Sequence, residues 1–161
     1  MVDKDETISQ TDDGKVTTTL KVYLKDVSFE SPYDQSNQPS HWDPTLAVEL
    51  ENRATELADD IYDVILKITA AATVADATAF LVEVHQGGIF RIKGFEPDAL
   101  QQILNVHCIR TLYPYACATI DDLVVKGGFP PLRLIPINFL ARYKKSLAQA
   151  ELPPDNEEED H

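Results

Sequence analysis

The sequence has little of what several protein classes require. It holds two cysteines in 161 residues, Cys108 and Cys117, which are too few for the disulfide framework of a small secreted domain and fit a reducing compartment. No apolar run approaches the ~20 residues that a membrane helix needs. The first residues, MVDKDETISQTDDGK, are acidic, whereas a signal peptide is basic and then apolar. We therefore expect the chain to stay in the cytoplasm.

Positive charge is also scarce. The chain has 14 Lys and Arg against 27 Asp and Glu, and a formal net charge of -13. Acidic residues gather at the two ends, so we expect an acidic flexible leader over residues 1–15, one domain over residues 16–148 and an acidic flexible tail over residues 149–161. Such ends either keep a chain soluble or dock on a basic partner. Because phosphate binding needs clustered positive charge, the composition argues against a nucleic-acid surface.

The motifs of common catalytic and cofactor sites are missing as well. The sequence contains no GxSxG elbow, no Walker phosphate loop, no GxGxxG and no HExxH. The soft ligands His107, Cys108 and Cys117 form one cluster, but a Cys-x8-Cys spacing matches no common zinc site, and cysteines in an apolar helical pattern are usually buried. The sequence therefore predicts a protein that is not an enzyme and uses no metal or cofactor.

What the chain does have is the alternation of apolar residues that is typical of strands. It occurs over residues 16–24, 46–51, 64–70 and 80–90. The phase slips at Lys25–Asp26, which predicts a β-bulge that points a new pair of side chains, those of Val27 and Phe29, outward. The short connection TVADAT between the last two runs predicts an antiparallel hairpin.

After residue 96 the period changes to that of helices. Pro97 and Asp98 suit a helix start, and one apolar face follows, formed by Leu100, Ile103, Leu104 and His107. Pro114 is expected to kink or break this helix; a second helical segment should end at Gly127–Gly128, and a last helix should start after Asn138. The order predicts an α+β fold, in which a kinked long helix and a C-terminal helix pack on one face of a four-stranded antiparallel sheet.

Two surface features remain. Strand parity predicts that Asp26, Glu30, Leu81 and Glu83 lie on the sheet face turned away from the helices. Such a face is either simply solvated or fits a basic partner. The other feature is the stretch GGFPPLRLIPINF, residues 127–139, whose three prolines exclude a helix interior or a central strand. With Phe29, Tyr113 and Tyr115, it forms either a groove for extended apolar polypeptide or a lid on the chain's own core.

Five motifs in the same order resemble the SecB family of protein-export chaperones. They are YLKDVSFE (23–30), LADDIYDVILKIT (57–69), TAFLVEVHQGGIF (78–90), YPYA (113–116) and GGFPPLRLIPINF (127–139). The resemblance covers roughly residues 16–145 and implies the same α+β fold. It also implies a cytoplasmic, ATP-independent holdase that binds unfolded precursor proteins, hands them to the motor ATPase SecA and assembles as a homotetramer, a dimer of dimers. The alternative is a SecB-like chaperone dedicated to a single partner, such as a toxin–antitoxin component.

The resemblance also implies roles for particular residues. The small basic zinc-binding tail of SecA, which carries its own zinc, would dock on Asp26, Glu30, Leu81 and Glu83. The client-binding groove would be lined by Phe29, Tyr113, Tyr115, Phe129, Leu132, Leu134, Ile135 and Phe139. Packing of the sheet against the helix, and with it tetramer assembly, would rest on Val82, Val84 and Gln86. The chain departs from the family pattern at Cys117, Ala118 and Leu140 and in its more acidic tail.

Overall fold

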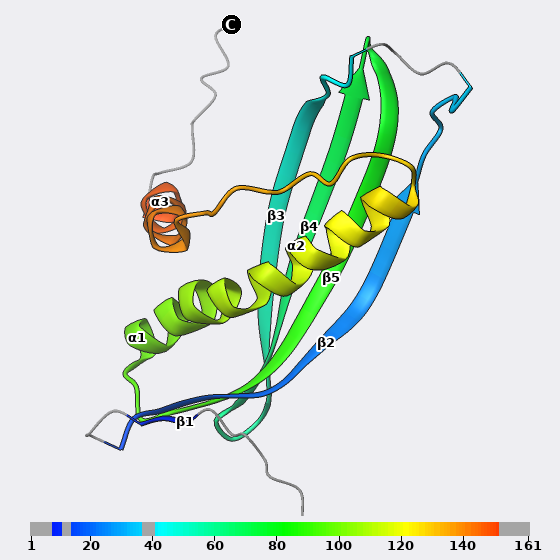
Figure 1. Ribbon diagram of the computed structural model, residues 1–161. Helices are drawn as coiled ribbons and strands as arrows, with labels where there is room; N and C mark the ends of the chain where they lie inside the picture. Colours follow the sequence, from blue (N-terminus) through cyan, green and yellow to red (C-terminus); the bar gives the residue numbers. More distant parts are fainter. Residues whose placement is uncertain (1–7, 11–13, 37–40, 152–161) are drawn as a thin grey trace, which may run out of the picture.

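The computed structural model describes residues 8–10, 14–36 and 41–151. One antiparallel sheet forms its base, a long helical segment crosses one face of this sheet diagonally, and a last helix lies beside the sheet edge (Figure 1). Most of the predicted leader and tail lies outside the described residues. Within the described part, no helix is both long and apolar enough to span a membrane.

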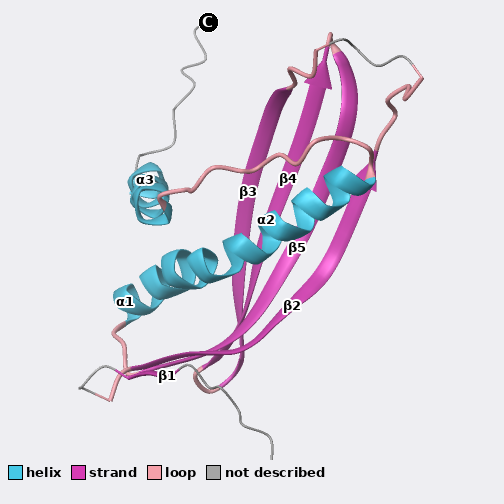
Figure 2. Ribbon diagram, viewed as in Figure 1, coloured by secondary structure: helices cyan, strands magenta, loops and turns pink. Residues whose placement is uncertain are grey.

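The sheet contains four long strands and one short one. The strands are β1 (Ile8–Gln10), β2 (Val16–Glu30), β3 (Thr45–Ala58), β4 (Ile61–Val74) and β5 (Ala77–Lys93). Their order is β1-β2-β5-β4-β3 and all neighbours are antiparallel, as Figure 2 shows for the long strands. The four-stranded antiparallel prediction and the β4–β5 hairpin are thus confirmed. The hairpin turns at Ala75 and Asp76, whose φ angles of 48° and 62° suit the tight turn that matches strand twist.

Strand β2 contains two irregularities in its pairing with β5. Its register shifts between Leu24 and Asp26, which confirms the bulge at Lys25, and also between Thr19 and Lys21, where none was predicted. The expected effect on the side chains is wrong. Val27 and Phe29 lie opposite the buried Val84 and Val82, so they stay on the helix face, and it is the acidic residues Asp26 and Glu30 that turn outward.

The long helical segment is continuous. It consists of α1 (Pro97–Gln102), the π-helical turn η1 (Ile103–His107) and α2 (Cys108–Lys126). Pro114 lies inside α2, so a break at this proline does not occur. The missing N–H removes one hydrogen bond, but Leu112, Tyr113 and Ala116 around it are buried, and this packing keeps the helix on the sheet.

The π-helical turn explains why one predicted core position is wrong. A π turn holds more residues than an α turn, so it rotates the buried stripe of the helix that follows. His107 was expected on the apolar face but is exposed, whereas its neighbours Val106 and Cys108 are buried. From there the buried stripe continues through Ile109 and Leu112 and covers the apolar side chains of β4 and β5.

Two local features define the ends of the helices. Gly128 has a φ of +91°, the left-handed conformation that closes a helix without steric cost, and Phe129 N–H donates to the Val124 carbonyl oxygen over 3.1 Å. The last helix, α3 (Phe139–Glu151), begins at the predicted cap, because Asn138 Oδ1 accepts the N–H of Ala141 over 3.0 Å.

A polar network holds α3 beside β3. The Arg142 guanidinium donates to Asn52 Oδ1 over 3.1 Å and to the Leu50 carbonyl oxygen over 2.8 Å. Asn52 in turn donates to Asn105 Oδ1 in η1 over 2.9 Å. The network therefore joins β3, the π-helical turn and the last helix.

Candidate functional site

The predicted acidic residues come together on the outer face of the sheet. In the β2–β5 register Asp26 lies opposite His85 and Glu30 lies opposite Leu81, with Glu83 between these pairs on β5. Asp26 and Glu30 are exposed, and Leu81, which lies opposite Glu30 and two residues before Glu83, is 40% exposed. We call Asp26, Glu30, Leu81 and Glu83 the acidic patch. The patch therefore combines three carboxylates on two paired strands with one apolar side chain, Leu81, at the end next to Glu30.

Glu83 differs from the other carboxylates of the patch because it has partners within the chain. Its Oε1 lies 3.4 Å from Lys67 Nζ, and its Oε2 lies 3.1 Å from His85 Nε2. Thr69 Oγ1 donates to Glu83 Oε1 over 3.4 Å. The hydrogen bond to His85 lowers the pKa of the Glu83 carboxyl. The hydrogen bond to Lys67 and the charge of Lys67 lower it further, and together these effects outweigh the partial desolvation of the carboxyl.

Basic residues adjoin the acidic patch on β3 and β4. A cavity of about 260 Å³ is lined by Glu51, Asn52, Arg53, Ile65, Lys67 and His85. Lys67 pairs with His85 in the strand register and also lies 3.9 Å from Glu51. Lys67 and His85 were not predicted as site residues; strand parity alone could have placed them on the outer face, but only the register shows that they meet Glu83.

The apolar stretch after α2 forms an extended loop over residues 129–138. It crosses the helix face of the sheet on its way to α3 (Figure 1). Two hydrogen bonds tie this apolar loop to α2: Arg133 N–H donates to Asp121 Oδ1 over 3.2 Å, and Tyr113 Oη donates to the Ile135 carbonyl oxygen over 2.7 Å. Arg133 has a φ of +51°, which an L-residue adopts only when its surroundings hold it there.

The predicted groove residues fall into three groups by exposure. Tyr113, Phe129 and Phe139 are buried; Phe29, Leu132 and Leu134 are half-buried; Tyr115 and Ile135 are exposed, at 53% and 75% respectively. One part of the loop therefore closes over the core of the chain itself. The other part presents apolar side chains to the outside.

Phe129 anchors the loop in an aromatic cluster. Its ring centroid lies 5.1 Å from that of Phe80, 5.2 Å from Trp42 and 5.7 Å from Tyr33. Phe29 stacks on Phe80 from the other side at 5.9 Å. Trp42 and Tyr33 were missed as members of this site, because they come from the connection between β2 and β3, whose position over the end of α2 no local pattern predicts.

More apolar surface lies on the helix face of the sheet. Leu46 and Val48 of β3 pair with the buried Ala72 and Ala70, so they point to the helix face, yet they are 41% and 38% exposed. The helices and the apolar loop therefore leave the β3 side of this face partly open.

The three residues assigned to assembly lie inside the protomer. Val82 and Val84 are fully buried between sheet and helix, and Gln86 is nearly so, with its Nε2 donating to the Tyr23 carbonyl oxygen over 2.9 Å. They therefore pack sheet against helix within one chain. Their contribution to an assembly stays a prediction.

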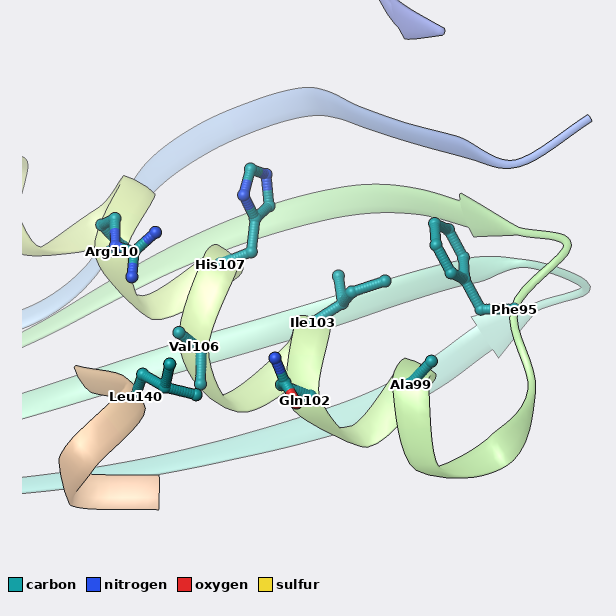
Figure 3. A pocket seen from close by; sticks show the side chains of 8 residues that line it. All are labelled: Phe95, Ala99, Gln102, Ile103, Val106, His107, Arg110 and Leu140. Atoms are coloured by element: carbon teal, nitrogen blue, oxygen red, sulfur yellow. The ribbon is translucent and has the colours of Figure 1, made fainter. Parts of the chain in front are cut away.

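Another cavity lies along α1 and η1. It measures about 360 Å³ and is lined by Phe95, Ala99, Gln102, Ile103, Val106, His107, Arg110 and Leu140 (Figure 3). Although the residue is exposed overall, partial desolvation of its imidazole, followed by the charge of Arg110, lowers the pKa of His107. Because its lining is mostly apolar and includes no carboxylate, this cavity offers no acid–base pair.

The titratable residues do not converge on a metal or redox site within the described part of the chain. No group of three His, Cys, Asp or Glu side chains could hold a metal ion there. Cys108 and Cys117 are free thiols, and burial raises the pKa of Cys108 to about 12. The chemistry of these residues is that of core packing.

An antiparallel sheet with an apolar, partly open layer on one face and an acidic patch on the other defines a protein that acts through its binding surfaces. The family model described as preprotein translocase subunit SecB matches residues 10–150. The chain belongs to the SecB family of protein-export chaperones, as its motifs indicated.

Curated relatives agree with this assignment. The protein-export protein SecB of Nitrosococcus oceani is 43% identical over 131 residues, which cover 80% of each chain. The protein of the same name from Halorhodospira halophila is 44% identical over 131 residues, covering 81% of this chain and 76% of the relative. The Hahella chejuensis protein is 42% identical over 139 residues, covering 84% and 87% respectively.

A solved structure is similar in fold. It is a SecB-like chaperone from Mycobacterium tuberculosis in complex with a ChAD peptide from an antitoxin, with a TM-score of 0.65 and 15% sequence identity. The match covers 75% of this chain and 90% of that one. At this identity the likeness concerns the fold alone.

Proposed function

We propose that this chain is an ATP-independent, non-enzymatic chaperone that holds unfolded precursor proteins and delivers them to the SecA motor of the translocase. The observation that carries the proposal is the placement of two different surfaces on opposite faces of one sheet in a SecB-family fold. The apolar loop and the open side of β3 lie on the helix face, and the acidic patch lies on the outer face. A client and a motor can then be bound at the same time.

The client surface is apolar and extended. Tyr115 and Ile135 present exposed apolar side chains, and Leu132 and Leu134 are half-buried beside them. Prolines at 130, 131 and 136 remove backbone donors, so the loop can stay extended without pairing with a second loop. Such a surface selects unfolded polypeptide, because a native protein keeps its apolar side chains inside.

The client experiment compares one slow-folding polypeptide in its unfolded and native forms, without nucleotide. The wild type should capture only the unfolded form, and Ile135→Ser should weaken capture while the fold persists. Val125→Ser is the matched control, because Val125 is a 53% exposed apolar side chain on α2 outside the predicted groove. Equal losses in both variants would contradict a defined groove, and failure of the wild type to bind any unfolded chain would favour the single-partner alternative.

The motor surface is the acidic patch. Asp26 and Glu30 are exposed carboxylates, and the apolar side chain of Leu81 lies opposite Glu30, which suits a small basic domain with an apolar contact. Such binding depends on salt, because the screening length is about 8 Å at ~0.15 M ionic strength. Affinity for SecA should therefore fall steeply above this salt concentration, whereas client capture by apolar contacts should change little.

The motor experiment neutralises two carboxylates of the patch. Asp26→Asn with Glu30→Gln should weaken SecA binding about five- to tenfold, since each exposed charge contributes up to ~1 kcal/mol. Glu49→Gln is the matched control, because Glu49 is exposed on the same face of β3, outside the patch. If Glu49→Gln weakens SecA binding as much as Asp26→Asn or Glu30→Gln alone does, binding depends on the charge of the whole face. In that case the assignment of the acidic patch is wrong.

Assembly and location complete the proposal. We infer a homotetramer, a dimer of dimers, in the cytoplasm, with Val82, Val84 and Gln86 supporting it by fixing how the helices lie on the sheet. Light scattering over a range of concentrations measures the molar mass. A molar mass that stops at two chains would contradict the tetramer. Val84→Ala distinguishes a role in protomer packing from a role in assembly, because a residue that acts only inside the protomer should change stability without changing the molar mass.

A further inference from the structure

One histidine lies inside the proposed motor surface. His85 lies on β5 opposite Asp26 of β2 and opposite Lys67 of β4. Its Nε2 is 3.1 Å from Oε2 of Glu83, which is two residues away on the same face of the strand. The side chain is 24% exposed, so solvent protons reach it. A titratable group thus touches the carboxylate of the acidic patch that Lys67 and Thr69 also contact.

We propose that His85 is a specificity-determining residue of the acidic patch, which makes the docking of a basic partner sensitive to pH. When His85 is neutral, Asp26 keeps its full charge toward a partner, and the charge of Glu83 is offset only by Lys67. When it is protonated, the imidazolium binds Glu83 and cancels one negative charge at the centre of the patch. This inference depends on the proposed docking of SecA, and it adds a residue and a regulatory property to that surface.

The charges around His85 come from four strands. Asp26 on β2 and Glu83 on β5 stabilise an imidazolium, whereas Lys67 on β4 opposes it. On β3, Glu51 lies 3.9 Å from Lys67, and Arg53 lines the same cavity as His85. Histidine is the side chain that ordinarily changes charge between pH 5 and 8. His85 is the histidine that adjoins the acidic patch.

The size of the effect follows from distance. A partner cation docked on Asp26 would lie about one strand spacing, ~5 Å, from the His85 ring. A unit charge at that distance in a water-like dielectric changes affinity about threefold, and less at high salt. Docking should therefore weaken about threefold as the pH falls from about 8 to about 6.

The experiment measures SecA binding at about pH 6 and about pH 8, the ends of the histidine range, for the wild type and two variants. His85→Gln is neutral at both values and His85→Lys is charged at both. Comparing the variants at one pH removes the titration of SecA itself, including its zinc ligands. The wild type should bind like His85→Gln at the high pH and about threefold more weakly than it at the low pH, approaching His85→Lys.

Two controls separate the outcomes. His107→Gln alters an exposed histidine on η1, away from the sheet's outer face, and should behave as the wild type at both pH values. Thermal unfolding checks that the His85 variants fold, and His85→Asn repeats the comparison with a shorter neutral side chain. If the wild type and the neutral variants weaken in parallel, the role of His85 is wrong while the docking proposal survives. If SecA does not bind even at the high pH, the docking proposal itself fails.

Discussion

Phe129 and Ile135 lie six residues apart in the same apolar loop, but their removal should have very different effects. Phe129 is 6% exposed and packs on Phe80, Trp42 and Tyr33. Truncating a buried phenylalanine costs about 3–5 kcal/mol, from lost burial and the cavity left behind. Such a loss is a large part of the ~5–15 kcal/mol that holds a domain folded. Ile135 is 75% exposed, so Ile135→Ala should change the free energy of unfolding by less than about 0.5 kcal/mol.

Denaturant unfolding measures both values with one internal probe. Trp42 is the only tryptophan and its ring centroid lies 5.2 Å from that of Phe129. Its fluorescence should therefore follow the loosening of the aromatic cluster, and circular dichroism should follow the sheet. Protein concentration must be the same for all variants, because assembly shifts apparent stability by mass action. Phe129→Leu, which keeps much of the volume, should lose less than Phe129→Ala.

Two results would contradict these roles of Phe129 and Ile135. If Phe129→Ala loses less than about 1 kcal/mol, the side chain does not anchor the loop, whatever its exposure. If Ile135→Ala loses as much as Phe129→Ala, the division of the loop into an internal anchor and an external surface is wrong. If Ile135→Ala is strongly destabilised, a client-binding defect in that variant could not be separated from unfolding.

Three further predictions concern other parts of the fold. Arg142→Ala should raise hydrogen exchange in α3 about five- to thirtyfold, because its guanidinium donates to two oxygen acceptors on β3; Lys144→Ala on the same helix should leave exchange unchanged, and equal effects would contradict the network. A thiol reagent should modify the half-buried Cys117 well before the fully buried Cys108, whose pKa burial raises to about 12; equal rates would contradict this. Burial, helped by a hydrogen bond to the Asp63 carboxylate, raises the pKa of Tyr23 to about 12 from 10.0. The contribution of Tyr23 to the free energy of unfolding is therefore complete below pH ~10 and is lost as the pH rises toward ~12. Tyr23→Phe should reduce the loss of stability over this pH range, and an unchanged pH dependence of stability would contradict this role.

The elements of the fold were predictable wherever one face of an element is buried. Alternation in β4 and β5 gave the correct faces because each second side chain packs on a helix. The features that the sequence did not predict are the bulge between Thr19 and Lys21, the π-helical turn and the continuation of α2 through Pro114. All three change the backbone locally to suit packing against a distant element, and a local pattern holds no information about that element.

The two surfaces were predictable to different extents. The acidic patch follows from strand parity once the bulge at Lys25 is recognised, because Asp26 and Glu30 then turn outward. The contact of Glu83 with Lys67 depends on the register between β5 and β4, which parity does not give. In the loop, composition shows that residues are apolar but not which of them face the core, so the sequence could not separate Phe129 from Ile135.

The position of the two surfaces also bears on how a client could be released. They share β5, whose side chains point alternately to the outer face, as Leu81 and Glu83 do, and to the core, as Phe80 and Val82 do. β5 is hydrogen-bonded along most of its length to both β2 and β4, and its inward side chains are fully buried. The close-packed core and the backbone hydrogen bonds to the two neighbouring strands leave little room for one side chain to move without its neighbours. We therefore expect a docked motor to receive a client by competing for its exposed segments while both are bound, because the sheet between the surfaces is too rigid to transmit a signal for release.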